Sequence, residues 1–168
     1  MILYVLRHAQ AGERVAGPED DARRLTADGR ERMRAAAIGM RRLGLKLDAI
    51  LTSPLPRASE TAAIVAKVYD GRPRPQVLEA LGSGALPVQV AAALSPYHSP
   101  GHVMIVGHQP QLSAVASTLL TGSPDLLRSR LKKGGCLALE FTSTLEAGSG
   151  ELLWMLTQRQ LRNLGTHA

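Results

Sequence analysis

The stretch Ile2-Leu3-Tyr4-Val5-Leu6-Arg7-His8-Ala9 decides the interpretation of this chain. Its first five residues are apolar and rich in β-formers, a pattern typical of a buried strand. A guanidinium and an imidazole follow directly, at the point where that strand has to end. Such side chains suit core packing poorly and suit the binding of a phosphoryl group well. We therefore expect an anion site at the carboxyl end of this strand.

The composition limits the class of protein. A chain of 168 residues with 45% hydrophobic and 20% charged residues fits one globular domain. Aromatic residues make up only 3%, which argues against nucleic-acid modules that stack bases on aromatic side chains. The net charge of +6 favours an anionic partner, and arginines concentrate between Arg14 and Arg42. Because no nucleic-acid motif accompanies them, we favour a solvated helix surface near an anion site over a nucleic-acid face.

Cysteine and histidine usage gives no indication of a metal or cofactor. The one cysteine, Cys136, excludes an internal disulfide, and its apolar neighbours predict a small core residue. His98 and His102 have the spacing of helical metal ligands, but Pro96 and Pro100 argue against a helix there. No apolar run reaches the length of a membrane span, and the first run is too short for a signal peptide. We expect a cytoplasmic protein without metal, cofactor or membrane partner.

Strands and helices are expected to alternate along the chain. Residues 9–25 are polar and predict a long loop. The remaining pattern predicts strands over 2–6, 48–52, 76–78 and 102–106, and helices over 26–43, from Arg57, over 87–94 and from Pro110. Two further strands, 136–141 and 151–157, predict a hairpin. We therefore expect one domain over residues 1–168: an α/β, three-layer α/β/α sandwich with a mostly parallel mixed sheet and a C-terminal antiparallel hairpin.

Basic residues follow three of the predicted strands. Arg7 and His8 end the first, Arg57 follows the second, and His108 follows the strand over 102–106. Ligands of open α/β sheets bind outside the carboxyl ends of the strands, where helix N-termini add backbone N–H groups. Each residue alone has an ordinary structural explanation, but independent roles do not account for their shared position. We expect the four side chains to meet in one anion pocket.

These residues belong to motifs that resemble the histidine phosphatase (phosphoglycerate mutase-like) superfamily. The motifs, in order along nearly the whole chain, are Arg7-His8-Ala9, Leu25-Thr26-x-x-Gly29, Ser53-Pro54-x-x-Arg57-Ala58-x-x-Thr61-Ala62 and Val106-Gly107-His108. The opening through Ala11 and the pattern Asp20-x-x-Arg23-x-Leu25-Thr26 are most similar to bacterial SixA-type phosphohistidine phosphatases. The resemblance implies a metal-independent hydrolase of signal transduction that acts on a phosphorylated protein, with a histidine phosphotransfer domain as one candidate.

The resemblance also implies roles for individual residues. His8 is the nucleophile that accepts the phosphoryl group, Arg7, Arg57 and His108 form the electrostatic pocket, and Arg23 helps to bind phosphate. The chemistry agrees, because phosphoryl transfer requires mainly positioning and charge stabilisation. A nucleophilic histidine must be neutral with one nitrogen free, and the two nearby arginines are expected to lower its pKa. The other ring nitrogen needs an acceptor that the sequence does not identify.

The chain departs from the superfamily pattern at two positions. Ala9 stands where the broad pattern has glycine, so its Cβ is a candidate to crowd the pocket. Larger members use an acidic residue after the third strand as general acid. Glu79 lies in that region, and we expect a solvated loop carboxylate there rather than a proton donor.

A pocket without an acid favours a leaving group that departs easily. Imidazole, with an unperturbed pKa of roughly 6.5, leaves far more easily than an alkoxide. We therefore expect transfer of a phosphoryl group from phosphohistidine to His8 and then to water. Two alternatives stay open: a phosphatase of small phosphate esters with Glu79 or another carboxylate as acid, and a non-catalytic binder of a phospho-ligand or nucleic acid.

Overall fold

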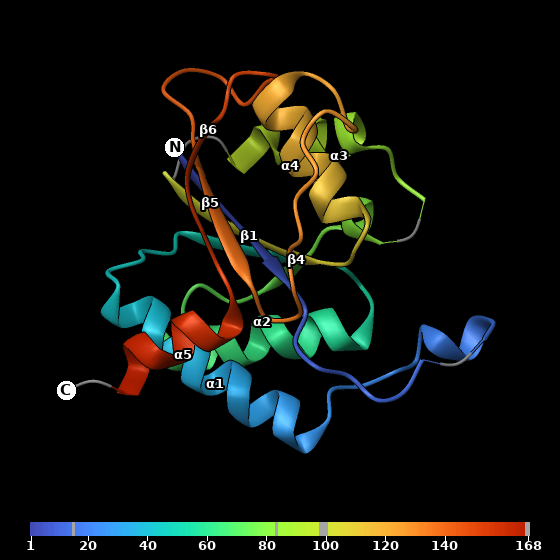
Figure 1. The fold of residues 1–168 in the computed structure, drawn as a ribbon, viewed down its shortest axis with the longest axis vertical. Helices are drawn as coiled ribbons and strands as arrows, with labels where there is room; N and C mark the ends of the chain where they lie inside the picture. Colours follow the sequence, from blue (N-terminus) through green and yellow to red (C-terminus); the bar gives the residue numbers. More distant parts are fainter. Residues whose placement is uncertain (15, 83, 98–100, 167–168) are drawn as a thin grey trace.

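The first strand, β1, lies inside a six-stranded sheet (Figure 1). The computed structural model describes residues 1–14, 16–82, 84–97 and 101–166. Within them the elements are β1 Ile2–Arg7, α1 Ala27–Arg42, β2 Ala49–Thr52, α2 Pro56–Val68, β3 Gln76–Val77, α3 Pro87–Leu94, β4 His102–Gly107, α4 Gln111–Thr121, β5 Cys136–Glu140, β6 Glu151–Leu156 and α5 Gln158–Thr166. Short 3-10 helices cover Pro18–Asp20, Glu79–Leu81 and Ser95–Tyr97. His98, considered above as a metal ligand, lies outside the described residues.

The strand order is β3-β2-β4-β1-β5-β6. β4 pairs in parallel with both β1 and β2, and β2 pairs in parallel with β3. β5 runs antiparallel to β1, and β6 runs antiparallel to β5. The mostly parallel sheet with a C-terminal hairpin is therefore confirmed. β1 occupies the junction between the parallel and antiparallel parts.

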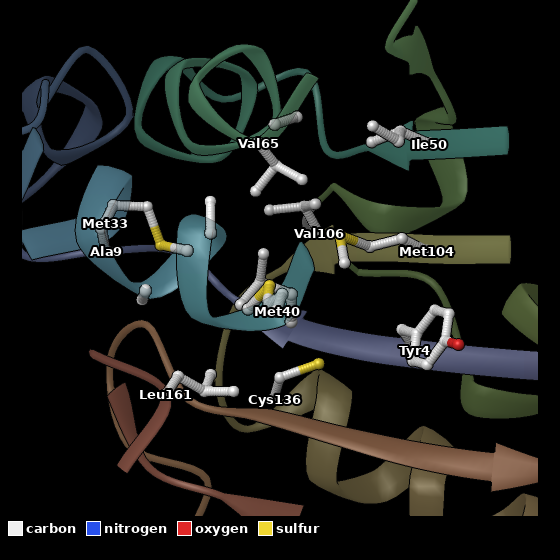
Figure 2. Close-up of a cluster of buried hydrophobic side chains, with 14 of the residues drawn as sticks. Tyr4, Ala9, Met33, Met40, Ile50, Val65, Met104, Val106, Cys136 and Leu161 are labelled. Atoms are coloured by element: carbon white, nitrogen blue, oxygen red, sulfur yellow. The ribbon is translucent and has the colours of Figure 1, made fainter. Parts of the chain in front are cut away.

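Helices cover both faces of the sheet, because β1 carries apolar side chains on both of its faces. Leu6 packs on one face with α1, α2 and α5, in a core that includes Met33, Met40 and Cys136 (Figure 2). Leu3 packs on the other face with α3 and α4. Full burial of one such side chain contributes about 1.5–3 kcal/mol. The predicted α/β/α sandwich and the buried position of Cys136 are confirmed.

The loop after β1 lies against the start of α1. The hydroxyl of Thr26 caps this helix by accepting a hydrogen bond from the Gly29 N–H at 2.9 Å. Gly29 in turn lies so close to the carbonyl of Gln10 that a Cβ at this position would clash. Ala11 and Leu25 form a β-bridge at the base of the loop. The long predicted loop is therefore closed at its base, where residues 24–26 bond to residues 10–12.

The terminal helix α5 is a feature that the sequence did not predict. It packs along α1, where Leu161 is fully buried. The two helices approach closely because a Cβ on Gly39 would overlap the carbonyl oxygen of Leu161. Within the described residues, no helix combines the length and the apolar character needed to cross a membrane.

Candidate active site

Strand register brings the predicted site residues to one rim of the sheet. Arg7 stands opposite Gly107 in the parallel pairing of β1 with β4. The backbone N–H of His8 donates to the Gly107 carbonyl at 3.0 Å, and the N–H of Ser53 donates to the Val106 carbonyl at 2.9 Å. The carboxyl ends of β1, β2 and β4 therefore lie side by side at one edge of the sheet. His8 and His108 end adjacent strands, with ring centroids 5.1 Å apart.

A pocket of about 520 Å³ opens at this rim. The predicted residues Arg7, His8, Arg23, Arg57 and His108 all line it, together with Gln10, Ala11, Gly12, Glu13, Arg14, Asp20, Thr26, Gln109 and Lys133. The side chains that were expected to meet therefore do so, and Arg23 joins them from the loop after β1. A second hollow of about 480 Å³ adjoins this pocket and shares Arg57 and His108 with it.

Glu79 is not brought to this pocket. It is exposed at the start of the 3-10 helix Glu79–Leu81 and lines neither hollow. This position agrees with a solvated loop carboxylate. Within the described residues, no cluster of three or more His, Cys, Asp or Glu side chains is arranged to hold a metal ion.

The tautomer of His8 follows from a backbone contact. Its Nδ1 lies 2.7 Å from the carbonyl oxygen of Ala9. A carbonyl only accepts, so Nδ1 carries the proton and Nε2 of the neutral ring keeps its lone pair. The acceptor that the sequence left unidentified is therefore the carbonyl of the next residue. The resulting ring has the form that a nucleophilic histidine requires.

Burial keeps the His8 ring uncharged. The side chain is only 5% exposed, and its pKa falls from 6.5 to about 4. Loss of hydration is the largest cause, while the hydrogen bond to Ala9 raises the pKa and Arg57 and Arg7 lower it. The expected influence of the arginines is confirmed in direction, although burial has the larger effect.

His108 is held in a similar state by Ser53. Its Nε2 lies 2.8 Å from the Ser53 Oγ, and Ser53 is fully buried. The serine O–H has no other acceptor among the described residues, so it donates to Nε2 and the proton of the neutral ring lies on Nδ1. Burial lowers the pKa of His108 to about 3, with smaller contributions from His8 and Arg57. Nδ1 is thus a buried donor without a partner in the described chain.

Backbone carbonyls fix the three guanidinium groups of the pocket. Nη1 of Arg7 donates to the Leu131 carbonyl at 3.0 Å, Nη1 of Arg57 donates to the Asp20 carbonyl at 2.8 Å, and Nη1 of Arg23 donates to the Gly12 carbonyl at 3.2 Å. In each guanidinium, Nε is buried and has no partner among the described residues. Like charges at this density repel each other. An anion bound in the pocket would relieve this repulsion.

Asp20 partly compensates the positive charge. Its carboxylate lies 3.0 Å from Nη2 of Arg23 and 3.6 Å from Nη2 of Arg57. The sequence motif contained Asp20 but gave it no role. Its position indicates that it orients these two arginines.

Two other contributors were missed at the sequence level. The Thr61 hydroxyl accepts from the Ala9 N–H at 3.0 Å and donates to the Arg57 carbonyl at 2.7 Å, so it joins the end of β1 to the start of α2. Its spacing of four residues from Arg57 was the available signal. Lys133 reaches the rim from the loop before β5, where its Nζ donates to Oε1 of Gln10 at 3.0 Å. Nothing in the local sequence indicated this.

Ala9 fits its position without crowding the pocket. It is fully buried, packs in the core on the α1 side of the sheet, and does not line the pocket. The alanine at this departure from the superfamily pattern is therefore compatible with the site.

This geometry defines an α/β protein with a pocket of basic side chains at the carboxyl ends of parallel strands, beside a neutral imidazole. Residues 3–82 match the model of the histidine phosphatase superfamily (branch 1). An uncharacterized protein of Picosynechococcus sp. is 36% identical over 160 residues, covering 94% of this chain and 96% of that protein. The chain belongs to the histidine phosphatase superfamily and is a phosphatase of that superfamily.

Solved structures share the fold at low sequence identity. The protein histidine phosphatase SixA complexed with tungstate superposes with a TM-score of 0.81 at 22% identity, covering 96% of this chain and 99% of that one. A phosphoserine phosphatase of Entamoeba histolytica in complex with 3-phosphoglyceric acid has a TM-score of 0.73 at 16% identity, covering 95% and 98%. The fold is therefore shared by phosphatases that differ in the substrate for which they are named.

The lowered pKa values lead to a test by NMR. In phosphate-free buffer near pH 6, we expect ¹⁵N spectra to show both His8 and His108 as neutral rings protonated on Nδ1. The pKa values of His8 and His108 in the folded protein lie below 6.5. As the pH falls, these two rings therefore take up protons in the unfolded chain before they do so in the folded protein. The free energy of unfolding should therefore fall as the pH decreases from about 6.5 towards 4, compared with a His8→Asn, His108→Asn variant. An imidazolium signal from either ring near pH 6 would contradict this account of the site.

Proposed function

We propose that this phosphatase removes the phosphoryl group from phosphohistidine on a partner protein, with His8 as the nucleophile. One observation carries the proposal: Nδ1 of His8 is committed to the Ala9 carbonyl at 2.7 Å, which leaves Nε2 as the nucleophilic nitrogen in a pocket lined by Arg7, Arg57 and His108. A neutral imidazole is a competent nucleophile when it is held in line with its target. A cytoplasmic location and a role in signal transduction belong to the same proposal.

In the first step, Nε2 of His8 attacks phosphorus. The Nε2–P bond forms while the P–N bond of the substrate breaks. A substrate ring protonated on its other nitrogen then leaves as neutral imidazole, so the cleaved nitrogen needs no proton. Positive charge develops on the His8 ring at the same time. The hydrogen bond from Nδ1 to Ala9, which favours the charged ring, stabilises that charge.

The basic side chains stabilise the transferred group. Arg7 and Arg57 supply fixed positive charge and N–H donors to the phosphoryl oxygens, and His108 lines the same pocket. Arg23 extends the cluster. In the second step, water attacks the phosphorus of phospho-His8 and the Nε2–P bond breaks. The bonding electrons return to Nε2, which leaves the ring neutral, and the protons of the water depart with inorganic phosphate and solvent.

The carboxylates near the pocket support a leaving group that requires little acid assistance. Two arginines engage Asp20, which therefore acts as an acceptor rather than a proton donor. Glu79 is exposed and outside the pocket lining, whereas Glu13 is exposed at its edge. Ester cleavage needs a well-placed acid to protonate the alkoxide. Imidazole leaves without one, so this arrangement favours phosphohistidine.

Trapping the intermediate tests the role of His8. Rapid acid-free quenching during turnover of a phosphohistidine peptide should yield a phosphoenzyme whose label maps to His8 by mass spectrometry. His8→Ala should abolish the label and lower kcat by at least about 10³-fold, because the covalent route is lost. Ser143→Ala, a change at an exposed residue outside the pocket lining, serves as the control. Full activity of His8→Ala, or a label on another residue, would exclude this mechanism.

Small phosphate esters are a second candidate substrate class. The phosphoserine phosphatase that shares this fold supports it, and so does the position of Glu13 on the pocket lining. Glu13 lines the pocket and Glu79 does not, so Glu13 is the carboxylate to test as the acid of this second candidate.

Comparison of the two leaving groups separates these candidates. We expect kcat/KM for a phosphohistidine peptide to exceed that for phosphoserine by at least about tenfold, because only the ester requires an acid. Glu13→Gln and Glu79→Gln should each leave phosphohistidine turnover within about twofold. Preference for the ester, together with its collapse in Glu13→Gln alone, would establish the second candidate instead.

A further inference from the structure

A groove runs between α1 and α2, outside the active site. Both helices lie on the same face of the sheet (Figure 1). The groove consists of two adjoining hollows of about 460 and 490 Å³ that share Arg34, Lys67 and Val68. Along α1 the lining recurs at Ala27, Arg30, Glu31, Arg34, Ile38, Arg41 and Arg42, which is one face of the helix. The 16 residues of α1 correspond to about 24 Å of length at 1.5 Å per residue.

The floor of this α1/α2 groove is apolar. Ile38 comes from α1, and Ile64 and Val68 come from successive positions on one face of α2. All three are half-buried. Ile64 and Val68 pack against the core beneath them and leave their remaining surface in the groove. Ile64 and Val68, four residues apart on α2, have the spacing of apolar side chains on one face of an amphipathic helix.

The rim of the groove is basic. It carries Arg30, Arg34, Arg41, Arg42 and Lys67, against a single acidic member, Glu31. Arg30 is paired with Glu60 at 2.7 Å, and Arg41 is paired with Asp70 at 2.9 Å. Arg34 and Lys67 are exposed, belong to both hollows, and form no ion pair among the described residues. Uncompensated positive charge therefore lies at the middle of the groove.

We propose that the α1/α2 groove docks an acidic amphipathic helix of a partner protein. Apolar side chains of that helix, three and four residues apart, fill the floor between Ile38 and Val68, and flanking carboxylates pair with Arg34 and Lys67. Nucleic acid satisfies the charge but presents a polar backbone to the apolar floor. A membrane surface is flat, whereas this apolar surface is recessed. An acidic amphipathic helix fits the recessed groove, covers its apolar floor and pairs with its basic rim.

The groove begins beside the active site. Ala27 lines the groove, and the preceding residue, Thr26, lines the pocket that contains His8. A partner docked through its helix is thus held next to the phosphoryl site, where docking raises the local concentration of a phosphohistidine on that partner. This consequence rests on the proposed function, whereas the docking itself does not.

Binding of a designed helix tests the docking directly. The probe is a fluorescent helical peptide of about 18 residues, with leucine at every third or fourth position and glutamate on the flanking positions. A matched peptide carries lysine in place of glutamate. By anisotropy at physiological ionic strength, the glutamate peptide should bind, and Arg34→Glu, Lys67→Glu should weaken it about tenfold or more. Lys46→Glu, Arg74→Glu, an equal charge change at exposed positions outside the groove, should alter Kd less than about twofold.

Further variants separate the contributions of the apolar floor, the basic rim and the catalytic chemistry. Ile38→Ala, which retains a good helix former, should weaken binding several-fold if the floor is filled. His8→Ala should bind the peptide as tightly as the native chain, so a failure of the proposed chemistry leaves this result unchanged. In the enzyme that retains His8, the double variant Arg34→Glu, Lys67→Glu should raise KM for a phosphohistidine carried on the glutamate peptide. The same double variant should leave turnover of free phosphohistidine unaltered.

Several outcomes would overturn the proposal. One is equal binding of the glutamate peptide to the native chain and to the double variant Arg34→Glu, Lys67→Glu. Another is binding of the lysine peptide as tightly as the glutamate peptide. Displacement of the peptide by single-stranded RNA or by anionic phospholipid vesicles at lower concentration would assign the rim to those ligands. A dimer in sedimentation that dissociates in Arg34→Glu, Lys67→Glu would assign the groove to a second copy of this chain.

Discussion

The hydrogen bond between the His8 ring and the carbonyl of Ala9 is the constraint on which the site depends. At 2.7 Å it fixes which nitrogen carries the proton and directs the other towards the rim. Because the acceptor is the backbone of the next residue, the ring follows the path of the chain beyond β1. That path is held in turn by the bond from Ala9 N–H to Thr61 and by the bond from His8 N–H to Gly107. The tautomer of the His8 ring is therefore determined by backbone positions.

The site concentrates positive charge, which the fold tolerates through a specific set of compensations. Carbonyl oxygens hold Arg7, Arg23 and Arg57, and the carboxylate of Asp20 lies against two of them. Burial keeps both imidazoles neutral, which removes two further charges from the cluster. The repulsion that is left favours binding of an anion.

The sequence predicted the fold and the pocket where the signal was local, and it failed where long-range contacts decided the outcome. An apolar run followed by Arg7-His8 reveals both a buried strand and its functional end. Helix α5 was missed because its docking depends on the close approach of Leu161 to Gly39, which lies far away in the chain. The role of the Ala9 carbonyl has no sequence signal, since every residue has a carbonyl. Lys133 reaches the rim only because β5 pairs with β1.

The central claim is that one oxyanion binds between the basic side chains, in line with the free nitrogen of His8. A crystal structure of this protein with tungstate tests it most directly. We expect Arg7, Arg57 and His108 to contact the tungstate, with the metal atom facing Nε2 of His8 and Nδ1 still bonded to the Ala9 carbonyl. Tungstate bound away from these side chains, or a His8 ring turned so that Nδ1 faces the oxyanion, would contradict it.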